Sequence, residues 1–169
     1  MAGSERYRKG RVKCMKRKGI LNKALMTAIA DMGHTDIMII GDSGIPMARP
    51  EQRIDIAVCE NVPSVQQVLK LVMDEMIYEK VVVAEEQKLY NPEHHKAICE
   101  ISDRCQVETM PHEELFNYYI PRAKYIVRTG DFMPWGNVVL VSGIDAHKWF
   151  QKPGVITPDY YAERANCEQ

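Results

Sequence analysis

The sequence predicts an α/β fold, namely a three-layer α/β/α sandwich with helices on both faces of a largely parallel or mixed central sheet. Two observations support this fold class. Helical patterns, with apolar residues three or four positions apart, alternate along the chain with short apolar runs that are typical of buried strands. With 169 residues and 46% hydrophobic content, the chain is also long and apolar enough to form one sizeable core.

Five elements are expected in the first half of the chain. Asn22 is a good helix cap, and Gly33 is typical of the residue at which a helix ends. Ser64 and Gln67 match a capping box, in which each side chain bonds a backbone N–H of the other residue, so a helix begins there. In order, the expected elements are a helix over 22–32, strands over 37–41 and 53–58, a helix over 64–76 and a strand over 81–84.

The second half continues this alternation as far as residue 141. Asn91 and Pro92 give the cap and the first-turn proline of a helix, since proline lacks an N–H that this turn would leave unpaired. In order, the expected elements are a helix over 91–105, a strand over 106–110, a helix over 111–119 and strands over 124–128 and 137–141.

The chain divides into one domain and two extensions. Residues 1–14 are rich in lysine and arginine and form a basic N-terminal extension, for which a solvated arm is a simpler interpretation than a polyanion-binding one. Residues 15–144 form the α/β domain. Residues 145–169 lose the periodicity of the domain and are expected to form a C-terminal extension.

Composition argues against several classes of function. The formal net charge is −1, so no field over the whole molecule would hold nucleic acid. Five scattered cysteines without a C-x-x-C pair indicate neither a disulfide framework nor a zinc ribbon, and they favour a reducing cytoplasm. The sequence has no stretch suited to a membrane helix and no glycine motif for nucleotides, so neither a membrane nor a nucleotide cofactor is expected.

One predicted strand carries a titratable group at each end. Gly33-His34-Thr35-Asp36 precedes the strand, and Gly41-Asp42-Ser43-Gly44 follows it. The His34 imidazole and the Asp42 carboxylate each lie beside a glycine, which lets the backbone turn tightly and lets a small ligand approach. Because an imidazole has an ordinary pKa of about 6.5, it can donate or accept a proton near neutral pH. The pattern therefore indicates acid/base chemistry.

Further short motifs follow in a fixed order. The full set is Gly33-His34-Thr35-Asp36, Gly41-Asp42-Ser43-Gly44-Ile45-Pro46, Arg53-Ile54-Asp55, Val62-Pro63-Ser64, Ala84-Glu85-Glu86, His112-Glu113 and Gly136-Asn137. In this order and approximate spacing, the motifs resemble the ribose pyranase and fucose mutarotase family, over Met15 to about Gly143. The turn at 42–46 and the Arg-Ile-Asp stretch are closer to the ribose branch.

The resemblance implies that the chain interconverts pyranose and furanose forms of an aldose, with D-ribose as the first expectation, without a cofactor or a metal. His34 falls on the family's catalytic histidine. The family's sugar-binding positions fall on Asp42, His112, Trp135, Gly136 and Asn137. Trp135 stands where the family usually has tyrosine, and its indole N–H donates a hydrogen bond but accepts none. A mutarotase for L-fucose or another aldose, and a non-catalytic sugar-binding or regulatory protein, are the alternatives.

The positions of His34 and Asp42 raise a geometric question. At about 3.3 Å per residue, a straight strand between them would hold them roughly 20 Å apart, too far for both to contact one pentose. Either the loops curl back over the sheet, or two subunits assemble the site. The resemblance favours a ring-shaped homo-oligomer, a pentamer or a decamer, with sites at the subunit interfaces.

Several of these residues also have purely structural interpretations. Asp42 belongs to an Asp-Ser-Gly turn, and His112 follows a proline where a helix would begin. Arg53 and Asp55 lie two positions apart and are expected to pair across the sheet. Glu93-His94-His95 lacks the spacing of three or four residues that helical metal ligands have, so a solvated helix face is expected there.

Overall fold

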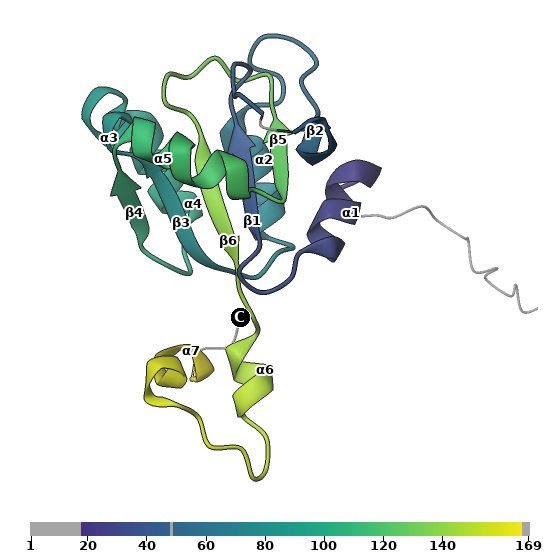
Figure 1. Cartoon of the computed structure of the whole chain (residues 1–169), viewed down its shortest axis with the longest axis vertical. Coiled ribbons are helices and arrows are strands. Elements are labelled where there is room, and N and C mark those ends of the chain that lie inside the picture. Colours follow the sequence, from purple (N-terminus) through teal and green to yellow (C-terminus); the bar gives the residue numbers. More distant parts are fainter. Residues whose placement is uncertain (1–17, 48, 167–169) are drawn as a thin grey trace, which may run out of the picture.

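A six-stranded mixed sheet lies at the centre of the molecule, in the order β2-β5-β1-β6-β3-β4 (Figure 1). The computed structural model describes residues 18–47 and 49–166. The strands are β1 (Ile37–Gly41), β2 (Arg53–Asp55), β3 (Tyr78–Ala84), β4 (Val107–Met110), β5 (Tyr125–Arg128) and β6 (Val138–Ser142). The pairs β2·β5, β1·β5 and β3·β4 are parallel, whereas β6 runs antiparallel to both β1 and β3.

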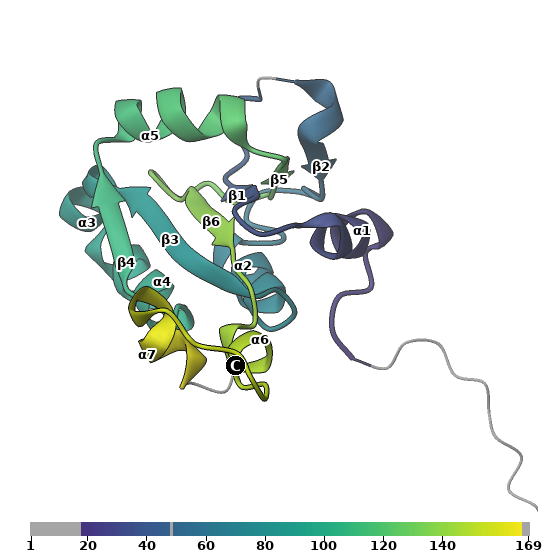
Figure 2. The same ribbon diagram turned by 60° about the horizontal axis from the view of Figure 1, so that its bottom comes forward.

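Helices cover both faces of this sheet. The α-helices are α1 (Lys23–Asp31), α2 (Val65–Met73), α3 (Glu85–Tyr90), α4 (Pro92–Ile101), α5 (His112–Tyr119), α6 (Ala146–Phe150) and α7 (Ala162–Ala165), with 3-10 turns η1 (Pro50–Gln52), η2 (Ile120–Arg122) and η3 (Asp159–Tyr161). One face packs against α1, α2 and α4, and the other against α5 and η2 (Figures 1 and 2). The predicted three-layer α/β/α fold is therefore confirmed.

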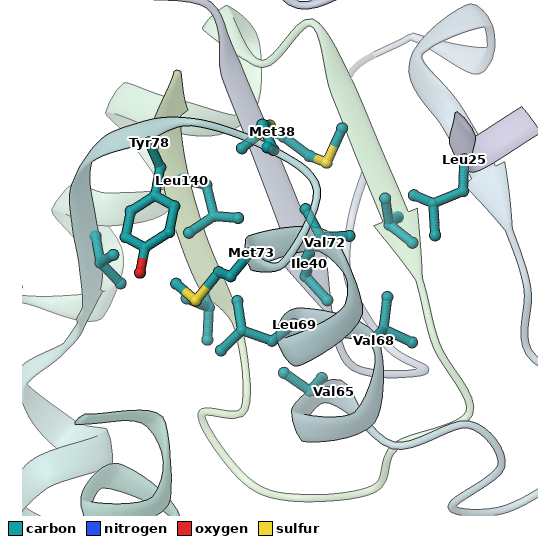
Figure 3. Close-up of a cluster of buried hydrophobic side chains, with 14 of the residues drawn as sticks. Leu25, Met38, Ile40, Val65, Val68, Leu69, Val72, Met73, Tyr78 and Leu140 are labelled. Carbon is teal, nitrogen blue, oxygen red and sulfur yellow. The ribbon is translucent and has the colours of Figure 1, made fainter. Parts of the chain in front are cut away.

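The larger of the two buried clusters joins α2 to the middle of the sheet. The Ser64 hydroxyl accepts from the Gln67 N–H at 3.2 Å, and Gln67 Oε1 accepts from the Ser64 N–H at 3.0 Å, so the predicted capping box begins this helix. Side chains of α2 then meet those of β1 and β6 (Figure 3), and none of the following is more than 3% exposed: Val65, Val68, Leu69, Val72, Met38, Ile40 and Leu140. Full burial of one such side chain stabilises the fold by roughly 2 kcal/mol, so this contact fixes α2 to the sheet.

The reversed direction of β6 decides which loops meet. At one edge of the sheet, here called the carboxyl edge, β1, β3, β4 and β5 end and β6 begins. At the opposite edge, the amino edge, β1 and β3 begin and β6 ends. The residues just before β6 therefore lie beside those just after β1, although almost 100 positions separate them in the sequence.

Several element boundaries differ from those expected. β2 ends at Asp55 rather than at residue 58, and α4 ends at Ile101 rather than near 105. The strand expected over 81–84 begins earlier, at Tyr78. Three helices were not expected, namely α3, α6 and α7, because their 6, 5 and 4 residues are too few to establish a helical period.

Two side-chain expectations on these elements have opposite outcomes. Arg53 pairs with Asp55 at 2.7 Å, and Arg128 on the neighbouring strand reaches the same carboxylate at 3.0 Å, which confirms a structural ion pair. The solvated helix face expected at residues 93–95 is wrong for His94, which is only 2% exposed. Its Nδ1 lies 3.1 Å from the amide nitrogen of Gln66 on α2, so this histidine helps to pack α4 against α2.

The described part of the C-terminal segment, residues 145–166, packs beyond the amino edge (Figure 1). Its two short helices hold each other, because the Ala165 carbonyl accepts hydrogen bonds from His147 Nδ1 at 2.9 Å and from Gln151 Nε2 at 3.3 Å. Ala146 and Ala165 are buried between them. The order of this segment thus comes from tertiary contacts rather than from periodicity.

Some expectations fall on residues that lie outside the described ones. These include the basic extension at 1–14, with Cys14, and Cys167 near the other end. Within residues 18–47 and 49–166, Cys59, Cys99 and Cys105 are free thiols. A search of the same residues finds no helix that combines the length and the apolar character needed to span a bilayer.

Candidate active site

Asp42 and Asn137 form a reciprocal pair at the carboxyl edge. The Asp42 N–H donates to Asn137 Oδ1 at 3.0 Å, and Asn137 Nδ2 donates to Asp42 Oδ2 at 3.0 Å. The other Asp42 oxygen accepts from the Gly44 N–H at 2.9 Å. Gly41 makes this close approach possible, because a Cβ at that position would lie 2.7 Å from Asn137 Oδ1. The pair therefore depends on glycine directly before Asp42.

The surroundings of Asp42 hold its proton more tightly than water would. Burial raises the pKa of the Asp42 carboxyl above its ordinary value, and the nearby Asp131 acts in the same direction. The hydrogen bonds from Gly44 and Asn137, and the charge of His112, lower the pKa but do not cancel the effect of burial. The charge of His112 thus acts on Asp42 at the same edge of the sheet.

His112 begins α5, directly after β4, and so also lies at the carboxyl edge. Its backbone N–H donates to Glu86 Oε2 at 3.0 Å, and its ring centre lies 4.2 Å from that of Phe116. Glu86 therefore bonds the first turn of α5, which is a structural role.

Trp135 lies in the loop between β5 and β6 and has a left-handed backbone, with φ of 54°. A bulky residue rarely adopts this conformation, and such strain often occurs at functional sites. Helix α3 holds the loop in place: Gln87 Nε2 donates to the Trp135 carbonyl at 2.7 Å, and the rings of Tyr90 and Trp135 lie 5.3 Å apart. Gly136 then leads to Asn137, and a Cβ on Gly136 would lie 2.9 Å from the Met133 carbonyl.

Asp131 ties the same loop to the start of α2. Its carboxylate accepts from the Val65 N–H at 2.7 Å and from the Met133 N–H at 2.9 Å, and the residue is only 2% exposed. An anionic group at a helix N-terminus is stabilised by the unpaired N–H groups there. The loop that carries Trp135 and Asn137 is therefore fastened to two helices, α2 and α3.

His34 lies at the amino edge, in the turn before β1. Its Nε2 is 3.1 Å from Glu79 Oε2, and its side chain is 36% exposed. The next residue, Thr35, also has a left-handed backbone, with φ of 68°, and its N–H donates to the Ser142 carbonyl at 2.9 Å. This turn is therefore fixed to the end of β6.

The sheet thus separates the predicted site residues into two groups. Asp42, His112 and the segment from Trp135 to Asn137 come together at the carboxyl edge, whereas His34 lies at the amino edge. Strand β1 stands between the two groups, and the described loops do not fold back to join them. A search of the described residues finds no group of three or more His, Cys, Asp or Glu side chains that could hold a metal ion.

Three residues with clear roles at the site were not predicted, namely Glu79, Gln87 and Asp131. Each acts through a partner at least 45 positions away in the sequence, so a local pattern could not identify it. The only sequence signal for Gln87 was its position just after the Ala84-Glu85-Glu86 motif.

Comparisons with known proteins connect this geometry to a family. The D-ribose pyranase 2 of Rubrobacter xylanophilus is 45% identical over 151 residues, which cover 89% of this chain and 98% of that protein. The D-ribose pyranase 1 of Streptomyces griseus is 43% identical over 150 residues, which cover 89% of this chain and 99% of that protein.

Solved structures agree with these relatives. The structure of Bacillus subtilis RbsD complexed with D-ribose is 36% identical, with a TM-score of 0.72, and the match covers 77% of this chain and 98% of that one. A fucose mutarotase from Streptococcus pneumoniae in complex with L-fucose is 16% identical, with a TM-score of 0.57 over 73% of this chain and 93% of that one, and shares the fold. A family model described as the RbsD / FucU transport protein family matches residues 15–145. This chain therefore belongs to the RbsD / FucU transport protein family.

Proposed function

We propose that this protein is a mutarotase that interconverts the pyranose and furanose forms of D-ribose. The observation that carries the proposal is the 45% identity to a D-ribose pyranase over nearly the whole of both chains. The bonded pair of Asp42 and Asn137 supports it, because a carboxylate and an amide together can accept from and donate to sugar hydroxyls.

The reaction breaks one C–O bond and forms another, with proton transfers at each step and no change of oxidation state. A base takes the proton of the anomeric hydroxyl, the bond between C1 and the ring oxygen breaks, and that oxygen receives a proton. After rotation in the open aldehyde, a different hydroxyl loses its proton and attacks C1, and the aldehyde oxygen takes up a proton to become the new anomeric hydroxyl, which closes the other ring. We assign the acid/base role to His34, since a neutral imidazole can accept a proton and an imidazolium can return it.

The other predicted residues are assigned to the sugar. Asp42, His112 and Asn137 would bond its hydroxyls, Trp135 would stack on its apolar face, and Gly136 would let the chain approach closely. The hydrogen bonds that Asp42 accepts from the Gly44 N–H and from Asn137 Nδ2 support this role, because they hold its carboxyl in one orientation.

We further propose that the complete site forms between subunits of a homo-oligomeric ring, a pentamer or a decamer. In such a ring the amino edge of one subunit, with His34, would meet the carboxyl edge of its neighbour. Exposed apolar side chains near the carboxyl edge support this arrangement: Val58 is 78% exposed, Val62 48%, Phe132 61% and Met133 44%. They lie on adjoining loops, since Asn61 donates to the Gly130 carbonyl and accepts from the Phe132 N–H.

We also place the reaction in the cytoplasm. The support is chemical: among the described residues Cys59 and Cys99 are exposed free thiols, and such thiols persist in reducing compartments. Fractionation of the source cells with an antibody to the protein checks this location, and recovery outside the cytoplasm would contradict it.

The experiment measures exchange between the ring forms of D-ribose by saturation-transfer NMR. We expect His34→Ala to lower the exchange rate by roughly 10² to 10⁴-fold, the contribution of one positioned acid/base group. Circular dichroism and the oligomeric state of the variant should match the parent protein. Unchanged exchange in this variant would remove His34 from the mechanism.

A second candidate is a non-catalytic sugar-binding or regulatory protein, and the observation that favours it is Trp135. Where the resemblance leads us to expect a phenolic hydroxyl, the indole supplies only a donor. D-ribose, L-fucose and other aldoses should therefore be compared in the same assay. Measurable binding without faster exchange for any of them would favour this second candidate, and exchange of another aldose alone would change the assigned substrate.

A further inference from the structure

The C-terminal segment reaches the proposed catalytic histidine through a shared carboxylate. Arg164 on α7 donates from Nη1 to Glu79 Oε2 at 2.8 Å, and the same oxygen lies 3.1 Å from His34 Nε2. We propose that Arg164 is a positioning residue, which orients Glu79 and offsets its charge so that Glu79 can hold the His34 imidazole. The inference rests on the proposed acid/base role of His34.

A β-bulge places Glu79 between these two partners. On strand β3, Tyr78 pairs with Ser142 and Lys80 pairs with Val141, so Glu79 is the extra residue between adjacent partners on β6. Such a bulge redirects one side chain out of the regular alternation, and bulges occur often beside active sites. Gly143 lies directly against the bulge, because a Cβ there would be 3.2 Å from Glu79 Cβ.

Arg164 is held at this position by its own segment. Its guanidinium carbon lies 5.8 Å from the centre of the Tyr161 ring, and the following residue, Ala165, is 1% exposed. The hydrogen bonds from α6 to the Ala165 carbonyl fix α7 relative to the end of β6. Arg164 also lies beyond residues 15–145, which match the family model, so its role is a feature of this C-terminal segment.

The charge balance around His34 gives Arg164 a measurable effect. The ionisable groups bonded at this turn are Glu79 from β3, Arg164 from α7 and Asp36 from the turn itself. The Asp36 carboxylate has hydrogen-bond partners of its own, since it accepts from the Gly33 N–H at 2.7 Å and from Lys124 Nζ at 2.8 Å. Without the guanidinium, the full charge of Glu79 would act on His34 and stabilise the imidazolium form. As pH falls, catalysis that needs the neutral imidazole would then be lost at a higher pH in the variant than in the parent protein.

The test compares Arg164→Gln and Arg164→Lys in the full chain, with exchange rates measured at several D-ribose concentrations and between pH 5 and pH 9. For Arg164→Gln we expect kcat to fall about 10-fold, well short of the loss in His34→Ala, with little change in KM. The acidic limb of its pH profile should move to higher pH. Arg164→Lys should recover part of kcat and return the profile toward that of the parent.

Lys148→Gln is the matched control. It removes an ion pair of the same kind from the same segment, because Lys148 Nζ lies 2.6 Å from Asp145 Oδ2. This ion pair does not involve Glu79. We expect its kcat, KM and pH profile to match those of the parent. If Lys148→Gln reproduced the effects of Arg164→Gln, the role of Arg164 would be general support of the segment and the inference would be overturned.

A double-mutant cycle tests the route through Glu79. If Arg164 acts through this carboxylate, Arg164→Gln should have no further effect on kcat in a Glu79→Gln background. Equal effects in the two backgrounds, or a parent-like pH profile in Arg164→Gln, would overturn the inference. Full activity of His34→Ala would remove His34 from the mechanism and with it the premise of this inference, whereas an inactive His34→Ala beside a fully normal Arg164→Gln would overturn the positioning role alone.

Discussion

Asp42 and Asn137 illustrate how a neutral amide can hold a half-buried carboxylate in place. Each residue both donates to the other and accepts from it, so neither side chain can rotate without losing a hydrogen bond. Each Asp42 oxygen accepts one hydrogen bond, Oδ1 from the Gly44 N–H and Oδ2 from Asn137 Nδ2, and Asn137 itself carries no charge. Because burial already raises the pKa of Asp42, a second charge at this point should be poorly tolerated.

We therefore expect Asn137→Asp to make stability strongly dependent on pH. Asp42 has a folded-state pKa above its unfolded value of about 3.9, so its contribution to stability is complete below that value and is lost as pH rises through the folded pKa. A second carboxylate about 3 Å away would raise that pKa further. The free energy of unfolding of the variant should then fall more steeply than that of the parent from about pH 4 toward neutral.

Urea unfolding at a series of pH values measures this effect. Asn137→Ala is the matched control, since it removes the same hydrogen bonds but adds no charge. Its stability should be lower than that of the parent by an amount that changes much less with pH. Parallel pH curves for Asn137→Asp and Asn137→Ala would show that the two carboxylates do not interact.

Single residues also show how far short sequence motifs can reach. The motifs at the two ends of one apolar strand made His34 and Asp42 candidates, and the family resemblance added His112 and Asn137. Glu79 could not be identified in this way, because its direction depends on a bulge that forms only when β3 pairs with β6. The sequence contains Glu79, but its contact with His34 can be identified only once β3 is paired with β6.

At the scale of elements, the loop between β5 and β6 depends on the helices that hold it. Asp131 bonds the first residue of α2, and Gln87 on α3 bonds Trp135. The capping box of α2 was readable from four adjacent residues, whereas α3 has six residues and directly precedes another helix. A sequence pattern can therefore predict where α2 starts, but not that Asp131, 66 positions later, completes that start.

Two caps on the same helix provide a matched prediction. Ser64→Ala removes one exposed capping bond and should lower the free energy of unfolding by about 1 kcal/mol. Asp131→Ala leaves the buried N–H of Val65 and the partly buried N–H of Met133 unpaired, and should cost roughly 3 kcal/mol. Because only Asp131 also holds the loop, only Asp131→Ala should weaken D-ribose binding strongly.

Chemical unfolding and ribose titration followed by NMR separate the two effects. Comparable binding losses in both variants would mean that the loop depends on α2 as a whole rather than on the Asp131 bonds. Binding by Asp131→Ala at the level of the parent would show that the loop keeps its conformation without that carboxylate.

At the scale of the whole molecule, the antiparallel direction of β6 determines at which edge of the sheet the candidate residues meet. Alternating patterns predicted the α/β class, and the length of the 37–41 strand indicated that His34 and Asp42 would lie far apart. The pairing order of the sheet was not readable, because strand neighbours such as β1 and β6 are far apart in the sequence. That order places Asn137 beside Asp42 and Glu79 beside His34, so the two groups of proposed site residues lie at opposite edges of the sheet.

If two subunits complete one site, two inactive variants should restore activity when they share a ring. His34→Ala lacks the acid/base group, and Asn137→Ala lacks part of the sugar-binding pair, so each homo-oligomer should be inactive or nearly so. Co-expression with different affinity tags, followed by sequential purification, yields rings that contain both. With random mixing in a head-to-tail ring, one interface in four joins two intact halves, so the exchange rate should recover to about a quarter of that of the parent.

The control is a ring assembled from two differently tagged His34→Ala chains, which should stay inactive because no interface receives an intact His34. Light scattering on each preparation establishes that the rings have the same size as the parent. A mixed ring no more active than its two parent variants would mean that both groups of site residues must belong to one chain, and an active monomer would contradict the shared site directly. Recovery close to a quarter, in rings of unchanged size, is the outcome that a site built from the amino edge of one subunit and the carboxyl edge of the next requires.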